Sequence, residues 1–307
     1  MRTRLRAFRI RGFFDNLSPE WALQFLQHRV ADPRMIRLIQ KWLKAGVSED
    51  GEWSETKIGT PQGAVVSPLI AIVYLHYVFD LWAEVWRKKI ATGEMIVVRC
   101  ADDLVVGFEH RHEARRFLQE FGERLAKFGL ELHPEKTRLI EFGRFAAQDR
   151  KKRGEGKPET FTFLGFTHIG GNDRRGRFAV RRKTAKKRLS AKLQQVKQEL
   201  RRRMHEPVPL VGQWLRRVVM GYNQYHGVPG NWSSLNRFRG QIQRYWRQTL
   251  RRRSQKARVT WDRLERLFNR WLPSPKLVHP YPGVRFDARH PNIRGGNRMR
   301  ETARPVR

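Results

Sequence analysis

Two adjacent aspartates, Asp102 and Asp103, are the residues of this 307-residue chain whose type and spacing most directly suggest chemistry. Short apolar runs precede and follow them, so the two acids are expected at the tip of a β-hairpin. Neighbouring carboxylates repel each other, and a divalent cation removes that conflict. Because Mg²⁺ prefers hard oxygen ligands and leaves positions for substrate phosphates, the pair is a potential site of phosphoryl transfer. A plain Asp-Asp turn on the surface is the alternative, and the dipeptide alone does not decide between them.

The segments around the two aspartates predict an antiparallel sheet with helices packed on one face. Four short strands are expected, at 95–99, 104–108, 130–133 and 137–142. A long amphipathic helix is expected to begin with Ser67 as its N-cap and Pro68 as its first residue. A second helix has an apolar face at Phe117, Leu118, Phe121, Leu125 and Phe128, and Gly129 ends it. The fold class that follows is α+β.

The second half of the chain is predicted to be helical throughout. Apolar residues recur at helical spacing in the segments 185–204, 210–226, 233–253 and 260–272. The other faces of these helices are rich in basic residues, among them Lys186, Lys187, Arg188, Lys192, Arg201, Arg202 and Arg203. One basic run is usually a solvated helix face, but basic helices in succession favour a surface that binds RNA.

The overall charge points the same way. The chain has 64 Lys and Arg against 29 Asp and Glu, a formal net charge of +35. Neutralising phosphates releases counterions and supplies affinity that does not depend on sequence, so a nucleic acid is the expected partner. On charge alone, a ribosomal-type protein and a binder of membrane surfaces remain alternatives. The 39% content of hydrophobic residues is sufficient for packed cores, which excludes a wholly disordered basic tail.

Several classes of protein are not expected. The single cysteine, Cys100, excludes an internal disulfide, and no Cys/His cluster has the spacing of a structural zinc site. A cytoplasmic location in a reducing environment fits best. The longest apolar stretch, 69–75, is far shorter than the roughly 20 residues that span a bilayer. The basic N-terminus has no apolar run of the length that a signal peptide needs, so neither membrane insertion nor export is expected.

Further motifs surround the aspartates in a particular order. They read GTPQG at 59–63, HPEKT at 133–137, FLGF at 163–166 and GYNQYH at 221–226. Each alone reads as a plain turn, a surface lysine or a strand end. Together, and in this order, they resemble the reverse transcriptase palm of group II intron proteins, followed by the maturase-specific domain that serves as its thumb. The resemblance covers about residues 10–287.

The resemblance implies an RNA-directed DNA polymerase whose partners are group II intron RNA, a DNA target or primer, and deoxynucleoside triphosphates. Asp102 and Asp103 would hold Mg²⁺ ions at the reacting phosphates. Lys136 would stabilise the leaving pyrophosphate or donate a proton to it. The residues implied to hold the nucleotide and the primer end are Gln62, Gly63, Cys100, Leu164 and Gly165.

Two positions depart from the family pattern. The segment 9–15 reads RIRGFFD, so Arg9 stands where the family's first metal-binding aspartate is expected. Asp15 corresponds to the trailing acid of that motif and cannot replace it. Cys100 stands where the family usually has an aromatic residue. The family's fingers region has no counterpart here, and residues 1–8 do not match the family, which suggests an N-terminally truncated or frameshifted gene copy. The single cysteine also excludes the zinc-bearing endonuclease domain found in some members.

The expected organisation is a partial palm at 1–168, a connector at 169–182, a helical maturase-specific thumb at 183–275 and a basic, disordered tail at 276–307. Three functions remain open: a polymerase with maturase activity, a non-catalytic RNA-binding maturase, and an inert remnant. Arg9 separates the first two, because the loss of an anchoring carboxylate predicts an impaired polymerase. The oligomeric state and the identity of the intron do not follow from the sequence.

Overall fold

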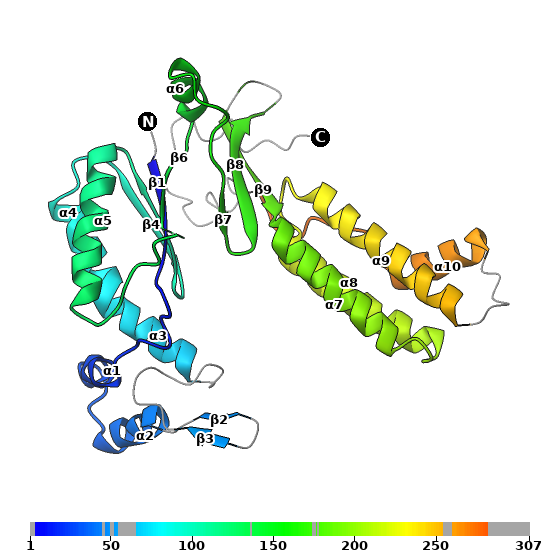
Figure 1. The fold of residues 1–307 in the computed structure, drawn as a ribbon, viewed down its shortest axis with the longest axis horizontal. Helices are drawn as coiled ribbons and strands as arrows, with labels where there is room; N and C mark the ends of the chain where they lie inside the picture. The colour runs from blue at the N-terminus through cyan, green and yellow to red at the C-terminus, as the bar shows by residue number, and fades with distance from the viewer. Residues whose placement is uncertain are drawn as a thin grey trace. The chain divides into compact units, whose positions relative to one another are not determined.

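A computed structural model describes residues 4–44, 47–49, 52–54, 66–135, 137–173, 176, 178–253 and 260–281. The chain forms two compact units, Met1–Leu164 and Gly165–Arg307 (Figure 1). The first unit combines helices with an antiparallel sheet, and the second consists of a β-hairpin and a set of long helices. The α+β fold class is therefore confirmed.

The sheet of the first unit has four strands in the order β4-β5-β1-β6, and the pairs are antiparallel. The strands are β1 (Arg4–Arg9), β4 (Met95–Cys100), β5 (Asp103–Phe108) and β6 (Arg138–Glu141). The predicted hairpin is thus confirmed as β4 and β5. The strand expected at 130–133 is wrong, since only an isolated bridge joins Leu132 to Ile10. The pattern analysis did not identify β1, a central strand whose six residues lie within the basic N-terminal segment.

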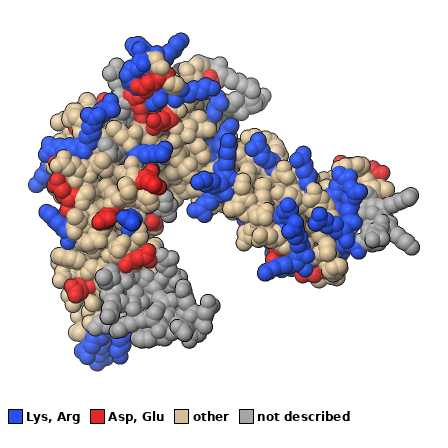
Figure 2. Space-filling view, in the orientation of Figure 1, with Lys and Arg blue, Asp and Glu red and all other residues tan. Residues whose placement is uncertain are grey.

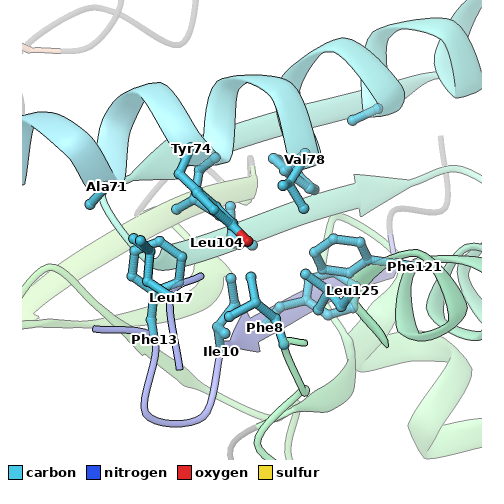
Figure 3. Packing of buried hydrophobic residues seen from close by; sticks show 14 of the residues in the cluster. Phe8, Ile10, Phe13, Leu17, Ala71, Tyr74, Val78, Leu104, Phe121 and Leu125 are labelled. Atoms are coloured by element: carbon cyan, nitrogen blue, oxygen red, sulfur yellow. The ribbon is translucent and has the colours of Figure 1, made fainter. Parts of the chain in front are cut away.

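A helical rod covers one face of this sheet. It consists of α3 (Ser67–Leu75), the π-helical turn η1 (His76–Asp80) and α4 (Leu81–Lys89). Figure 3 shows Tyr74 and Val78 on the rod, directed toward Phe8 and Ile10 beneath them. The N-cap is Val66 rather than Ser67, so the predicted helix start is displaced by one residue. Helix α5 (Arg111–Ala126) packs into the same core, and Gly129 after it has φ +71°, as its predicted role as a stop requires.

One face of the apolar rod belongs to the core of the first unit. By length and composition, the run Ser67–Lys89 could cross a membrane, which is weak evidence by itself. Four of its side chains are completely buried in the core of the first unit: Tyr74, Leu75, Val78 and Phe79. Burial of these side chains accounts for part of the hydropathy of the run, whereas Leu69 and Val85 on the rod are 62% and 51% exposed.

An arginine from α5 accounts for the π-helical turn within the rod. The Arg124 guanidinium donates to the carbonyl oxygens of Val78 and Tyr77, at 2.7 and 3.1 Å. A side chain that inserts into the helical ladder in this way is a known cause of local distortion. Burial lowers the pKa of Arg124. The turn ends at Asp80, which accepts a hydrogen bond from Arg99 of β4.

Shorter elements complete the first unit. They are α1 (Pro19–Gln27), α2 (Pro33–Lys44), the hairpin of β2 (Val47–Glu49) and β3 (Glu52–Ser54), α6 (Ala146–Lys152) and β7 (Phe161–Phe163). The side chain of Ser18 caps α1 by accepting from the Trp21 backbone N–H. Helix α1 adds Phe25 to the aromatic cluster around Tyr74 and Tyr77.

The described part of the second unit is built on four helices, and all four predicted helical segments are confirmed. They are α7 (Lys186–Arg202), α8 (Val208–His226), α9 (Trp232–Arg252) and α10 (Trp261–Trp271). Their apolar faces form one core, in which Leu215, Val219, Phe238 and Trp246 are completely buried. The periodicity of 3.6 residues was therefore a sufficient signal for these elements.

The structure differs from the expected organisation at two places. The segment 169–182 was expected to be a connector, but it lies within a hairpin of β8 (Phe166–Asn172) and β9 (Phe178–Thr184). Its glycines and charged residues resemble a loop, although the backbone pairing is regular. At the other end, Val278 and His279 donate backbone N–H groups to the Gly227 carbonyl, at 2.8 and 3.1 Å, so the first part of the expected tail packs on the end of α8. The rest of that tail, 282–307, lies outside the described residues.

Candidate functional site

The tip of the β4–β5 hairpin carries the paired acids. Cys100 pairs with Asp103, which leaves Ala101 and Asp102 as a two-residue turn. Ala101 has φ +53°, a left-handed conformation that tight hairpin turns require and that Gly or Asn normally supplies. Asp102 and Asp103 are both partly exposed, and Cys100 is an exposed free thiol. Strained backbone at the most acidic turn of the sheet is typical of a functional site.

The end of β1 lies beside this tip. The backbone of Arg9 is directly opposite Asp103 in the antiparallel register of β1 and β5. The position where the family pattern has its first metal-binding aspartate is therefore adjacent to the Asp-Asp turn. Asp15 lies further along the chain, in a turn where its N–H donates to the Gly12 carbonyl at 3.0 Å. Asp15 thus lies in a turn after β1, whereas Arg9 is the last residue of that strand.

The residues at the tip do not fit a two-ion site built on carboxylates from both strands. Asp102 and Asp103 supply hard oxygen ligands, but the neighbouring position on β1 is an arginine, which brings positive charge rather than a ligand. Among the residues described, no three His, Cys, Asp or Glu side chains come together as a metal cluster. Two carboxylates can hold one Mg²⁺ together with substrate phosphates. Within the part of the chain that the structure describes, the tip offers carboxylates from β5 and its turn but none from the end of β1.

A bidentate ion pair fixes the base of the turn. The Arg99 guanidinium on β4 donates to both carboxylate oxygens of Asp80, from Nε at 2.7 Å and from Nη2 at 2.5 Å. Its Nη1 also donates to the Ala101 carbonyl at 3.4 Å. The Arg99 side chain is only 15% exposed, so the pair is shielded from solvent. The rod and the hairpin tip are thereby tied together, a link that the sequence reasoning missed because the partners are 19 residues apart.

The other residues implied for nucleotide and primer binding are placed as follows. Gln62, Gly63 and Lys136 lie outside the described residues. Leu164 and Gly165 both have positive φ, +49° and +77°, so they form a tight turn at the boundary of the two units. Gly adopts such an angle without strain and Leu does not, so Leu164 is the strained residue of this turn. That the pair holds the primer end stays a prediction.

The basic residues at 186–203 differ in exposure and in their contacts with acidic side chains, and therefore in how readily they can bind phosphate. Lys186, Lys187, Arg188, Arg201 and Arg202 are exposed, and Lys192 donates to Gln195 at 2.9 Å. Arg203 is engaged with Glu199 at 2.8 Å and Glu206 at 3.2 Å, and its guanidinium lies over the Trp214 ring at 5.2 Å. These contacts raise the pKa of Arg203, the hydrogen bond to Glu199 being the main cause. Arg202 also lies 3.8 Å from Glu199, but its side chain is 83% exposed, so it and the exposed Arg201 are more accessible to phosphate than Arg203.

A groove between α7 and α8 adds residues that the sequence reasoning did not identify. Arg188 and Lys192 line it from α7, and Arg217 and Tyr225 line it from α8. Figure 2 shows how Lys and Arg side chains crowd the helical unit. Basic side chains together with an exposed tyrosine are suited to a nucleic-acid strand, because cations bind phosphates and aromatic rings stack on bases.

The GYNQYH motif has a structural role in the second unit. The buried amide of Asn231 accepts from the Thr184 N–H at 2.9 Å and donates to the Thr184 hydroxyl and the His226 carbonyl, at 2.8 and 2.9 Å. Tyr222 stacks on Phe238 with ring centroids 3.6 Å apart. Burial lowers the pKa of His226 to about 4. The motif thus holds the end of β9 against α8 and α9, and Asn231 was missed because its partners are distant in sequence.

Comparisons with known proteins agree with this geometry. Residues 5–168 match the family described as reverse transcriptase (RNA-dependent DNA polymerase). The group II intron-encoded protein LtrA of Lactococcus lactis subsp. cremoris is 42% identical over 67 residues, which cover 22% of this chain and 11% of that protein. An uncharacterized 91 kDa protein in the cob intron of Schizosaccharomyces pombe is 37% identical over 67 residues, covering 22% of this chain and 8% of that protein. The chain thus matches only a small part of each relative.

Among solved structures, telomerase from Candida albicans, in complex with a fragment of telomeric RNA, is similar in fold. The TM-score is 0.50 at 10% sequence identity, and the alignment covers 87% of this chain and 44% of that one. At this identity the likeness concerns the fold alone.

Proposed function

Since the chain belongs to the reverse transcriptase (RNA-dependent DNA polymerase) family, we propose that it is by descent a group II intron-encoded reverse transcriptase and maturase, which binds intron RNA and has an impaired polymerase site. Its further partners would be a DNA primer, deoxynucleoside triphosphates and a divalent ion, with Mg²⁺ as the expected one. It would work in the cytoplasm. The observation that carries the proposal is the pair Asp102 and Asp103 at the tip of a hairpin within the residues that match the family, in a chain that also contains a strongly basic helical unit.

In this proposal the two units have separate tasks. The first would place a primer end and a nucleotide at the hairpin tip, where Asp102 and Asp103 attract a cation and Arg99 keeps the turn in place. The second would hold RNA through the exposed cations of α7 and the groove lined by Arg217 and Tyr225. Binding would require no base-specific contacts, since phosphate recognition positions a nucleic acid without reading its sequence.

The RNA-binding part is tested by affinity at increasing salt, measured by fluorescence anisotropy with a structured, labelled RNA. If the basic surface neutralises roughly six phosphates, affinity should fall about a thousandfold between 50 and 200 mM salt. The variant Arg201→Ala/Arg202→Ala should reduce the slope, whereas an Arg153→Ala variant in the first unit, whose guanidinium pairs with Glu155 at 2.7 Å, is the control. A wild-type affinity that is absent or insensitive to salt would remove the basis of the proposal.

A second candidate is a maturase that binds RNA without catalysing polymerisation. Arg9, opposite Asp103 at the end of β1, is the observation that favours it. An arginine at this position contributes charge that repels a divalent ion, and the polymerase reaction depends on such ions. Little or no primer extension by a chain that binds RNA tightly would support this candidate.

A further inference from the structure

A second groove, between α9 and α10, lies apart from the residues used so far. Its lining combines three arginines, two amides and two aromatic rings, of which Phe268 is buried and Trp261 exposed; the polar members are Arg239, Arg244, Arg247, Gln243 and Asn269. The floor includes Gly240, where an added Cβ would meet nothing within 4 Å, so the middle of the groove is open. All these residues belong to the second unit.

Trp261 is the central feature of this groove. Its side chain is 64% exposed, more than any other large apolar residue that the structure describes. The Arg247 guanidinium lies over the ring, 4.0 Å from its centroid. A cation over the ring holds an aromatic side chain in place, worth about 0.5–1 kcal/mol at an exposed site. The indole is thus held at the surface with much of its area available to a further partner.

The charges around the ring favour an anion. Glu265 is the one acidic residue in the lining of the groove, against three arginines. Arg239 donates to the Leu272 carbonyl at 3.2 Å, which anchors it beside the groove, and Arg244 is exposed. Gln243 and Asn269 each offer a donor and an acceptor, the groups that recognise the edge of a nucleobase. A negatively charged ligand with a flat, polar-edged ring satisfies all of these features together.

We propose that this groove binds single-stranded RNA, with an unpaired base stacked on Trp261 and the flanking phosphates at Arg244 and Arg247. Bases in a duplex are stacked on one another, so only an unpaired segment offers a free face to the indole. The inference rests on the proposed function, because it assumes that the chain binds RNA. The groove proposal adds where the RNA binds and which RNA binds there, a loop or a single strand. The basic face of α7 specifies neither.

The test compares Trp261→Ala with Trp261→Phe in the full chain. The probes are a labelled 12-nucleotide single-stranded RNA and the same strand in a fully paired duplex, and the readout is anisotropy. Trp261→Ala should lose about tenfold in affinity for the single strand, and its affinity for the duplex should stay within about twofold of wild type. Trp261→Phe should retain most of the binding, since phenylalanine also stacks. Trp232→Ala, which removes a 48%-exposed tryptophan at the start of α9, is the matched control and should bind both probes normally.

The outcomes separate this proposal from the broader one. If wild type binds neither probe, the proposed function fails and the groove proposal with it. If wild type binds both and Trp261→Ala does the same, only the groove proposal is overturned. Equal losses of affinity for the two probes would also overturn it. A ring that stacks only on unpaired bases can be removed without weakening the binding of a duplex.

A second variant keeps the proposal testable should Trp261→Ala unfold. Arg244→Ala removes an exposed cation and should lower the slope of log affinity against log salt, for the single strand, by about one. Arg263→Ala, an exposed residue of α10 outside the lining, should leave that slope unchanged. Equal slopes for Arg244→Ala and wild type would contradict the proposal.

Discussion

A single residue, Arg9, decides how the reverse transcriptase fold is interpreted in this chain. Sequence comparison with the family pattern identified the substitution, and the strand register then placed its backbone beside Asp103. A carboxylate at this position would add a further oxygen ligand beside Asp102 and Asp103, whereas arginine adds a charge of the wrong sign. Membership of the family and activity as a polymerase are therefore separate questions for this protein.

The contacts that hold the acidic turn were not predictable in the same way. Asp102 and Asp103 were recognisable because they are adjacent and flanked by apolar runs. Arg99 and Asp80 gave no signal, because an ion pair between a helix and a strand depends on tertiary packing. The same holds for Asn231, whose partner Thr184 is 47 residues away.

Removal of Asp80 should loosen the first unit. In Asp80→Ala the mostly buried Arg99 guanidinium loses both of its carboxylate hydrogen bonds, and we expect a loss of about 2 kcal/mol in the free energy of unfolding. Glu84→Ala, which removes surface pairs with Arg87 and Lys88 on the same rod, should change stability far less. Urea unfolding followed by circular dichroism measures both, and equal effects of the two substitutions would contradict the assigned role of Asp80.

The stability of the second unit should depend on pH through His226. Burial lowers its pKa to about 4 from the ordinary 6.5, so the unfolded chain binds the proton more readily than the folded one between these values. Stability is therefore complete above pH 6.5 and decreases as the pH falls toward 4. His226→Gln should lose less stability than wild type as the pH falls through this window.

The control is His168→Asn. The pKa of His168 is lowered too, mainly by burial, so this variant separates the contributions of the two histidines. Parallel pH profiles for wild type and His226→Gln would rule out this explanation.

At the scale of elements, periodicity was a reliable guide and local composition was not. The long amphipathic helices α7 to α10 follow from apolar residues at 3.6-residue spacing. The β8–β9 hairpin escaped prediction, because Gly170, Gly171 and the charged residues of β9 resemble a connector. The π-helical turn was also unpredictable, since its cause is Arg124 on another helix.

Close packing of α8 on α10 leads to a prediction about glycine. A Cβ on Gly212 would lie 2.6 Å from the Trp271 ring, whereas a Cβ on Gly221 of the same helix would meet nothing within 4 Å. Gly212→Ala should therefore cost about 1–3 kcal/mol through overpacking, despite the better helix propensity of alanine. Gly221→Ala should stabilise the unit, by up to about 1 kcal/mol. Thermal unfolding of the two variants checks the contrast, and stabilisation by both would show that the helices do not pack this closely.

At the scale of the whole molecule, two hydrophobic cores support two different kinds of surface. The first unit has its acids at the hairpin tip, and the second has basic helices and two grooves. A net charge of +35 attracts any polyanion, so charge predicted the class of partner before any element was known. It did not predict which surface binds, because that depends on how each helix packs.

The most direct measurement is primer extension by the full chain on an RNA template with Mg²⁺, at protein concentrations that saturate RNA binding. The account predicts RNA binding with little or no extension, at a level no higher than that of Asp102→Ala, because Arg9 leaves the ion site at Asp102 and Asp103 incomplete. Robust extension by the wild-type chain that disappears in Asp102→Ala would contradict it.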